Sequence, residues 1–191
     1  MTLGITSARQ GEGKTLVASN LAVSLALGSQ KKTIIIDLNI VSPKLHHVFG
    51  TVQSPGLAEA FSNGSIHVSH TTVEHLSVLT TGNFLGQEKD VSHSASFSDL
   101  STRAILRPML GLDHLAAFRD IIYSLEQVYD FIILDMPAMN SKDVPLLFAN
   151  QLNGLIIVVD SGKTKQEDIE SIFRQVNAHQ VIGFVFNRFT E

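Results

Sequence analysis

The feature that most constrains this chain is the segment GEGKT at residues 11–15, together with the sequence on either side of it. The apolar run Leu3–Ser7 precedes it, and Thr15–Leu27 carries apolar residues at helical spacing until Gly28 ends the pattern. A glycine-rich turn between a strand and a helix presents unpaired N–H groups at the helix start, where the dipole favours an anion. The arrangement therefore predicts a phosphate-binding loop, although Ala8 stands where the usual pattern begins with glycine.

Each residue type in this loop has a chemical task. Gly11 and Gly13 permit tight curvature and close approach of the backbone to phosphate oxygens. Lys14 would supply positive charge to the β- and γ-phosphates, and Thr15 would supply a hydroxyl to Mg²⁺. The alternative is a glycine-rich turn that binds nothing, but the flanking strand and helix favour nucleotide binding.

Strand-like runs alternate with helical segments along the chain, which is typical of an α/β fold with a doubly wound, mostly parallel sheet. After the first strand, further strands are expected at Thr33–Ile36, His75–Leu79, Tyr129–Leu134, Leu155–Val159 and Val181–Phe186. Further helices are expected at Lys44–Phe49, Gly56–Ser62, Leu115–Val128, Val144–Asn150 and Gln166–Asn177. We expect residues 1–191 to form a single domain, with a long polar loop at about 83–102.

Three apolar strands end in an aspartate, at Asp37, Asp135 and Asp160. The carboxyl ends of parallel strands meet at one edge of the sheet, where the ligand crevice lies. Enzymes with a phosphate-binding loop place a carboxylate there, aimed at Mg²⁺ or its water shell. We therefore assign Asp37 and Asp135 to the site and expect Asp160 only to begin a turn.

Composition limits the classes of function. The chain has 14 Lys and Arg against 18 Asp and Glu, and its net charge of -4 argues against a large nucleic-acid surface. It has no cysteine, which excludes disulfides and cysteine-ligated metal sites and is consistent with the cytoplasm. The eight histidines do not form a convergent set of metal ligands. No run reaches the ~18 apolar residues that a membrane helix needs.

Four segments together resemble the MinD/ParA-like P-loop ATPases. They are GITSARQGEGKTLVASNLAVSLA, TIIIDLNIVSPKLHHVFG, FIILDMPAMNSKDV and NGLIIVVDSGKTKQEDIESIFRQVNAHQVIGFVFNRF. Within that group the chain is most similar to the cytoplasmic domain of bacterial tyrosine kinases (BY-kinases), which accompany polysaccharide chain-length proteins. The segments SPGLAEAFSNGS and HLSVLTTG also resemble this branch.

The resemblance implies a role for each matching position. The catalytic residues would be Lys14, Asp37 and Asp135, with Asp37 near the acceptor hydroxyl and Asp135 as the Walker B acid. The metal ligands would be Thr15, Asp37 and Asp135. The residues that bind the nucleotide would be Gly11, Glu12, Gly13, Lys14, Thr15, Leu16, Asn187 and Arg188, with Asn187 near the adenine.

The resemblance also implies cofactors, partners and a location. The cofactors would be ATP (or ADP) and Mg²⁺. The partners would be a membrane-anchored polysaccharide co-polymerase protein and further copies of the chain, without nucleic acid. The location would be the cytoplasm, at the inner face of the membrane through a partner or a further segment.

Some positions depart from the family patterns. Arg9 stands where MinD/ParA proteins carry an intermonomer lysine, which BY-kinases also lack, so Arg9 favours the kinase branch. Asn39 replaces the second acid of an Asp-x-Asp motif, and Val41 replaces an expected arginine. Asparagine can coordinate through its carbonyl but cannot accept a proton as a base.

Two expected pieces of a BY-kinase are not found in this sequence. There are only two tyrosines, Tyr123 and Tyr129, instead of a tyrosine-rich tail, and no amphipathic helix precedes the first strand. Either the chain is a domain excised from a longer protein, or it is a family member without self-phosphorylation.

Three functions remain open. The first is an ATP-Mg²⁺-dependent tyrosine phosphotransferase or ATPase linked to exopolysaccharide or capsule synthesis. The second is a non-catalytic nucleotide-binding module that regulates a polysaccharide chain-length protein, which Asn39, Val41 and the few tyrosines favour. The third is a ParA/MinD-type positioning ATPase, which the missing intermonomer lysine disfavours.

Overall fold

The computed structural model describes residues 1–84, 112–140, 146–149 and 151–188. The strands are β1 (Thr2–Ser7), β2 (Thr33–Asp37), β3 (Ser69–His70), β4 (Leu76–Leu79), β5 (Phe131–Asp135), β6 (Gly154–Asp160) and β7 (Val181–Asn187). The helices are α1 (Lys14–Gly28), α2 (Leu45–Val48), α3 (Leu57–Asn63), α5 (Leu112–Glu126), α6 (Leu146–Ala149) and α7 (Gln166–Phe173), with a 3₁₀ turn at Ala178–Gln180.

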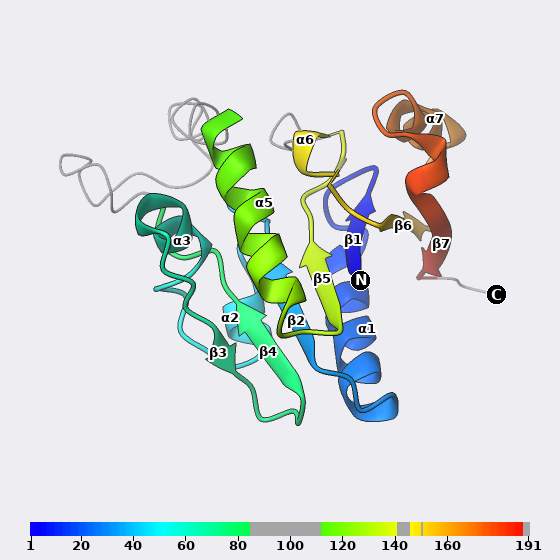
Figure 1. The fold of residues 1–191 in the computed structure, drawn as a ribbon. Coiled ribbons are helices and arrows are strands. Elements are labelled where there is room, and N and C mark those ends of the chain that lie inside the picture. Colours follow the sequence, from blue (N-terminus) through cyan, green and yellow to red (C-terminus); the bar gives the residue numbers. More distant parts are fainter. Residues whose placement is uncertain (85–111, 141–145, 150, 189–191) are drawn as a thin grey trace, which may run out of the picture.

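The seven strands form one sheet in the order β3-β4-β2-β5-β1-β6-β7 (Figure 1). Every neighbouring pair is parallel except β3 and β4, which run antiparallel at one edge. The prediction of a doubly wound, mostly parallel α/β fold is therefore confirmed. The strand β3 was not predicted, because two residues are too short to show a period.

Most predicted elements agree with the structure to within a few residues, but the last helix is shorter than predicted. It ends at Phe173, whereas the sequence pattern predicts Asn177. Beyond Phe173 the chain turns, so that Val176 is buried, and the Asn177 side chain accepts a hydrogen bond from the His179 N–H at 3.1 Å. An asparagine that caps the following 3₁₀ turn therefore replaces the last predicted turn of the helix.

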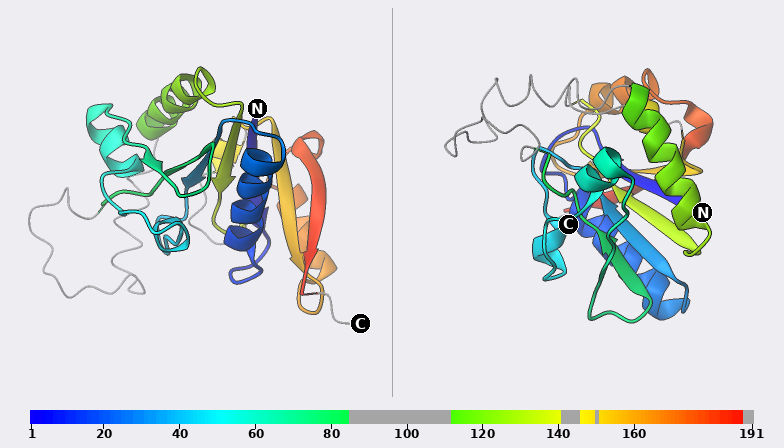
Figure 2. Two further views of the ribbon diagram at one scale, coloured as in Figure 1. Left: turned by 90° about the horizontal axis from the view of Figure 1, so that it is seen from below. Right: turned by 60° about the vertical axis from the view of Figure 1, so that its left-hand side comes forward.

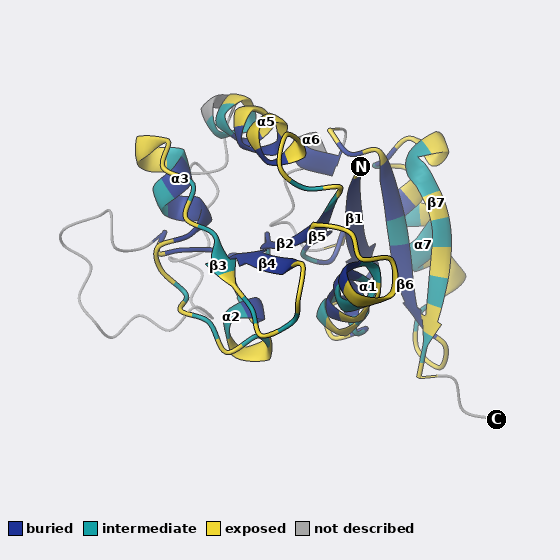
Figure 3. Ribbon diagram, turned by 60° about the horizontal axis from the view of Figure 1, so that its bottom comes forward, coloured by how far each residue is buried: buried dark blue, intermediate teal, exposed yellow. Residues whose placement is uncertain are grey.

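Helices cover both faces of the sheet (Figures 2 and 3). The cluster on one face contains α1 and α2, and the cluster on the other face contains α3, α5, α6 and α7. Consecutive residues of β2 supply both clusters, because Ile34 and Ile36 face one side and Ile35 the other. All three are fully buried, and each such side chain contributes about 1.5–3 kcal/mol.

Small side chains set the position of α1. Ala18, Ala22 and Ala26 are fully buried and recur every four residues, so they line one face of the helix. Leu16, from the predicted apolar set, is instead 59% exposed. Alanine leaves little bulk between the helix and the sheet, so the start of α1 lies close to the carboxyl ends of the strands.

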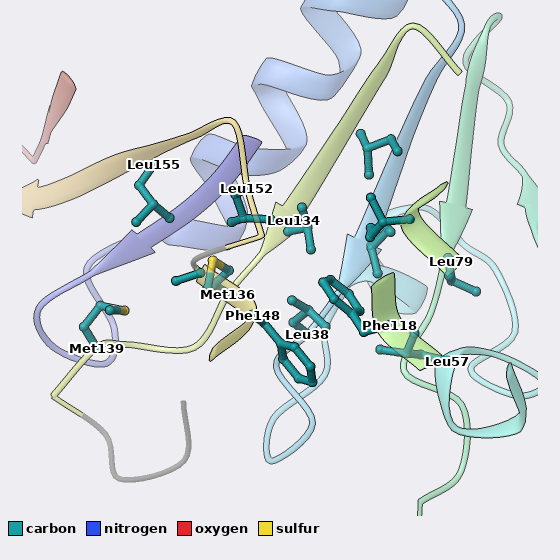
Figure 4. Close-up of a cluster of buried hydrophobic side chains, with 14 of the residues drawn as sticks. Leu38, Leu57, Leu79, Phe118, Leu134, Met136, Met139, Phe148, Leu152 and Leu155 are labelled. Atoms are coloured by element: carbon teal, nitrogen blue, oxygen red, sulfur yellow. The ribbon is translucent and has the colours of Figure 1, made fainter. Parts of the chain in front are cut away.

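The hydrophobic cluster that contains α3, α5, α6 and α7 holds the end of β5 in place (Figure 4). The rings of Phe118 and Phe148 lie 4.5 Å apart between centroids and pack beside Leu134. Met136, which follows the strand-end aspartate Asp135, is 1% exposed in the same cluster. An apolar anchor on each side of Asp135 therefore holds its backbone in place.

The polar loop predicted at 83–102 lies outside the described residues, except for residues 83 and 84. Phe84 is 6% exposed and belongs to a small cluster with Ile40 and Ala58, where it also approaches the ring of Phe61 at 6.1 Å. The described ranges contain no helix that is both long and apolar enough to cross a bilayer.

Candidate nucleotide-binding site

The loop between β1 and α1 has the backbone shape of an anion cradle. Gly11 and Gly13 have φ values of 86° and 98°, in the left-handed region that favours glycine. The helix begins at Lys14, and its first amides have no partner within the helix. These N–H groups can therefore bind an anion.

Asn187, at the end of β7, binds the backbone of the loop. Its Nδ2 donates a hydrogen bond to the Glu12 carbonyl oxygen at 2.9 Å. A Cβ at Gly13 would clash with the same Nδ2, and the φ of 98° at this residue also favours glycine. Asn187 thus contacts the loop itself, and its position near the adenine stays a prediction.

Lys14 is the loop's cation, and it is 6% exposed. Burial lowers the pKa of its ammonium group, while the carboxylates of Asp135 and Glu12 act in the opposite direction. A charge in a poorly solvated site interacts more strongly with a charged ligand than a charge in water. Lys14 is thus suited to a phosphate group that enters the cradle.

Asp37 and Asp135 are partners on the same rung of the parallel pair β2 and β5. Both are fully buried. Asp37 Oδ1 accepts a hydrogen bond from the Asn39 N–H at 3.0 Å, and its Oδ2 accepts from the N–H groups of Lys44 at 2.9 Å and Leu45 at 3.0 Å. Burial raises the pKa of Asp37 to about 6, against the opposing effect of these three amides.

Asp135 has a different environment. Its Oδ2 accepts a hydrogen bond from the Thr15 hydroxyl at 2.6 Å. Burial and then the negative charge of Asp37 raise the pKa of Asp135 to about 7, with Thr15, Lys14 and Lys44 opposing. Its Oδ1 is buried and has no hydrogen-bond partner in the part of the chain that the structure describes.

This set of atoms fits a magnesium ion. A hydroxyl and a carboxylate are oxygen ligands of the kind that Mg²⁺ takes, usually with several waters retained. A bound ion or one of its waters would satisfy the unpaired Oδ1 of Asp135. The ion would also stabilise the ionised form of an acid whose pKa is raised in its absence.

The segment after β2 departs from the family motif at Asn39 and Val41. The Asn39 N–H helps to hold Asp37, and Val41 packs against a small apolar cluster. A basic residue is nevertheless close by, since Lys44 is among the cations that oppose the raised pKa of Asp135. Lys44 follows Pro43 at the start of α2, and no pattern in the sequence assigned it to the site.

The remaining predicted residues lie in varied surroundings. Leu16 is exposed beside the loop. Arg188 Nη1 forms an ion pair with Asp160 Oδ2 at 2.7 Å, and this hydrogen bond lowers the pKa of Asp160. Asp160 also accepts a hydrogen bond from the Gly162 N–H at 3.3 Å, in the turn after β6.

Arg9 forms its ion pair within the chain. Its Nε lies 2.9 Å from Asp168 Oδ2, in the first turn of α7. Neither Asp168 nor Thr164 was predicted from the sequence to lie at the loop, where Thr164 donates a hydrogen bond to the Glu12 carboxylate. Only the strand order, which places β6 beside β1, brings these residues to the loop. No group of three His, Cys, Asp or Glu side chains able to hold a metal ion occurs in the described ranges.

Known proteins are similar to this chain in sequence and in fold. The chain is 26% identical over 199 residues to the tyrosine-protein kinase CpsD of Streptococcus agalactiae, covering 99% of this chain and 75% of CpsD. It is 23% identical over 192 residues to the succinoglycan biosynthesis transport protein ExoP of Rhizobium meliloti, covering 97% and 22% of the two chains. The solved structure of the chimerical protein CapA2B2 matches with a TM-score of 0.77 at 25% identity, covering 100% of this chain and 77% of that one.

The similarity to CpsD confirms the resemblance to bacterial tyrosine kinases. The family of CobQ/CobB/MinD/ParA nucleotide binding domains matches residues 3–191. That match includes the loop, both strand-end acids and the last strand, and it confirms the predicted nucleotide-binding class. The chain therefore belongs to the CobQ/CobB/MinD/ParA nucleotide-binding domain family.

Proposed function

We propose that this domain binds ATP with Mg²⁺ and transfers the γ-phosphoryl group to a tyrosine hydroxyl, in the synthesis of an exopolysaccharide or capsule. The observation that carries the proposal is the hydrogen bond between Thr15 and Asp135, beside the buried Lys14. It brings a hydroxyl, a carboxylate and a cation together at the mouth of an anion cradle. The similarity to relatives named tyrosine-protein kinases supports the choice of acceptor.

In this proposal the loop provides position and charge. The amides at the start of α1 bind the phosphates, and Lys14 offsets the negative charge that shifts during transfer. Thr15 and Asp135 would hold Mg²⁺, which neutralises charge on the β- and γ-phosphate oxygens. Leu16 and Arg188 would lie beside the bound nucleotide, and Asn187 would keep the loop closed.

Asp37 would accept the proton of the tyrosine hydroxyl. Its Oδ2 already accepts two amide hydrogen bonds, but its Oδ1 accepts only one from the described part of the chain, which leaves a lone pair there. Its raised pKa of about 6 makes it a stronger base than an ordinary aspartate while it stays mostly ionised at neutral pH. Asn39 cannot take this part, because an amide does not accept a proton.

A transfer assay tests the proposal. The chain would be incubated with γ-labelled ATP, Mg²⁺ and a tyrosine-containing peptide, in parallel with Lys14→Ala. We expect the label on the peptide to fall at least about 100-fold in the variant, since phosphate-binding charges act in the transition state. The exposed Lys31→Ala is the matched control and should label normally. Equal labelling by wild type and Lys14→Ala would contradict the proposal.

A second candidate function is a nucleotide-dependent switch without catalysis. It is favoured because three amides already bind the carboxylate of Asp37, and because Asn39 beside it cannot act as a base. In that case ATP binds through the same loop and only changes the contacts made with a partner. Calorimetric binding of ATP with Mg²⁺, together with turnover at background, would select this candidate. Measurable transfer to tyrosine would exclude it.

The partner in this proposal is a membrane-anchored polysaccharide protein that holds the domain at the inner face of the membrane. The name of ExoP, a succinoglycan biosynthesis transport protein, supports this class of partner. We also propose that 1–191 is one domain that self-associates. The cis ion pair of Arg9 with Asp168 argues against ParA/MinD-type dimerisation through this position. ATP-dependent dimerisation in light scattering, without transfer to tyrosine, would favour that alternative.

A further inference from the structure

Glu12 is a buried carboxylate inside a loop that is built to bind anions. It is 3% exposed. A carboxylate that faced the cradle would repel a phosphate group, and a buried one is costly unless its oxygens are hydrogen-bonded. Here Oε2 accepts a hydrogen bond from the Arg9 N–H at 2.8 Å, and Oε1 accepts one from the Thr164 hydroxyl.

The hydroxyl of Thr164 can give its hydrogen only to Glu12. Its oxygen already accepts a hydrogen bond from the Asp160 N–H at 2.9 Å. An ionised carboxylate can only accept, so the one proton of the hydroxyl must lie on the side of Glu12. The Thr164 side chain therefore joins the end of β6 to Glu12 with both of its hydrogen-bonding functions in use.

Two further contacts connect the same stretch of loop to the same region. Arg9 pairs with Asp168 of α7 at 2.9 Å, and Asn187 of β7 donates to the Glu12 carbonyl at 2.9 Å. Residues 9 and 12 are thus held by elements that follow them by more than 140 residues. Glu12 is the centre of these contacts, since its side chain and its backbone both take part.

We propose that Glu12 is a positioning residue, whose carboxylate joins the Arg9 amide to the Thr164 hydroxyl and holds the loop in its phosphate-binding shape. The role of its side chain is thus to shape the loop rather than to touch the ligand. The inference deepens the proposed function and rests on nucleotide binding at this loop. It assigns the same task to Thr164, which lies outside the loop.

Two substitutions of Thr164 test the proposal. Thr164→Val removes the hydroxyl but keeps the branched shape, while Thr164→Ser keeps the hydroxyl. By calorimetry with ADP and Mg²⁺, we expect Thr164→Val to weaken binding about tenfold, because a charged acceptor loses its donor. Thr164→Ser should stay within about twofold of wild type. Equal affinities of the Val and Ser variants would overturn the proposal.

A double-mutant cycle adds a readout that a merely structural role would not move. If Glu12 acts through Thr164, Glu12→Ala combined with Thr164→Val should weaken binding little more than the worse single variant. If the losses in log affinity are additive, the two residues act separately and the proposal fails. Thermal melting without nucleotide reports whether each variant is folded at the binding temperature.

Hydrogen exchange separates this proposal from the proposed function. In the nucleotide-free protein the Arg9 amide should exchange slowly in wild type and Thr164→Ser, and at least tenfold faster in Glu12→Ala. If Arg9 behaves so but ADP does not bind, the proposed function fails while the role of Glu12 in shaping the loop stands. If the Arg9 amide exchanges at the same rate in all variants, Glu12 does not hold the loop.

Discussion

Asp37 and Asp135 sit on one rung of the sheet, yet they have opposite surroundings. Both end an apolar parallel strand, and both are fully buried. Asp37 accepts three main-chain hydrogen bonds, whereas Asp135 accepts one from a hydroxyl and keeps a bare oxygen within the described structure. The same local pattern has therefore produced one acid that organises the backbone and one that is open to a ligand.

The residue two positions later explains much of the difference. After Asp37 comes Asn39, whose N–H turns back to the carboxylate. After Asp135 comes Pro137, which has no N–H and cannot make this contact. A proline at this position therefore leaves the Asp135 carboxylate without the main-chain contact that Asp37 receives from Asn39.

The sharpest test of this difference is the dependence of nucleotide binding on Mg²⁺. Asp135→Asn should lose the gain in affinity that Mg²⁺ provides, by about 10- to 100-fold, because a metal-site carboxylate is removed. Asp37→Asn should keep most of that gain. Calorimetric titration of ADP with and without Mg²⁺ measures both. If the two variants lose the gain equally, the two acids do not differ in the way that we describe.

A second test uses pH. Because the pKa values of Asp37 and Asp135 are raised to about 6 and about 7, the folded chain binds more protons than the unfolded chain above the ordinary aspartate pKa of 3.8. The contribution of these two acids to the free energy of unfolding should therefore fall as pH rises from about 4 to about 7. Asp135→Asn should be more stable than wild type at pH 8, on the order of 2 kcal/mol, and should gain nothing at pH 4.

Denaturant unfolding without nucleotide or Mg²⁺ at several pH values gives this comparison directly. Asp130→Asn, a substitution of an exposed acid, is the matched control for the loss of one negative charge. A difference in stability between Asp135→Asn and wild type that does not grow between pH 5 and pH 8 would contradict the raised pKa of Asp135.

The smallest effect on stability is expected from Asp37→Ala, which removes the acceptor of three main-chain hydrogen bonds. Asp37→Ala leaves the N–H groups of Lys44 and Leu45 without their acceptor but also removes a costly buried charge. The two changes offset each other in part, so unfolding at pH 7 should become easier by only about 1 kcal/mol. Hydrogen exchange of the Lys44 and Leu45 amides should accelerate more clearly. Unchanged exchange there would show that Asp37 does not hold the start of α2.

Much of the fold could be predicted because the local sequence patterns agree with the elements that form. Apolar β-branched runs predicted the strands of the parallel core, and the phosphate-binding loop was recognised from its glycines and Lys14. The common edge of the strand-end acids followed from the parallel arrangement, and the structure shows Asp37 and Asp135 directly opposite each other.

The remaining features depend on partners that are distant in sequence. Nothing near Glu12 indicates that its carboxylate meets Thr164, because the contact arises only when β6 lies beside β1. The buried face of α1 was also not evident, since its alanines contact the sheet while the larger Leu16 is exposed. Both features depend on contacts between elements that are distant in sequence. The hydrophobic periodicity along one segment carries no information about such contacts.

The contacts of the loop also have a consequence for synthesis on the ribosome. The ribosome makes the loop well before β6 and β7, and the hydrogen bonds of the loop to Thr164 and Asn187 span 152 and 175 positions. Contacts of such separation form late, after the costly closure of a long chain segment. A growing chain therefore carries the complete GEGKT motif while all of these later residues are added, before the shape of that motif is fixed, and nucleotide can stabilise the domain only after β7 has emerged.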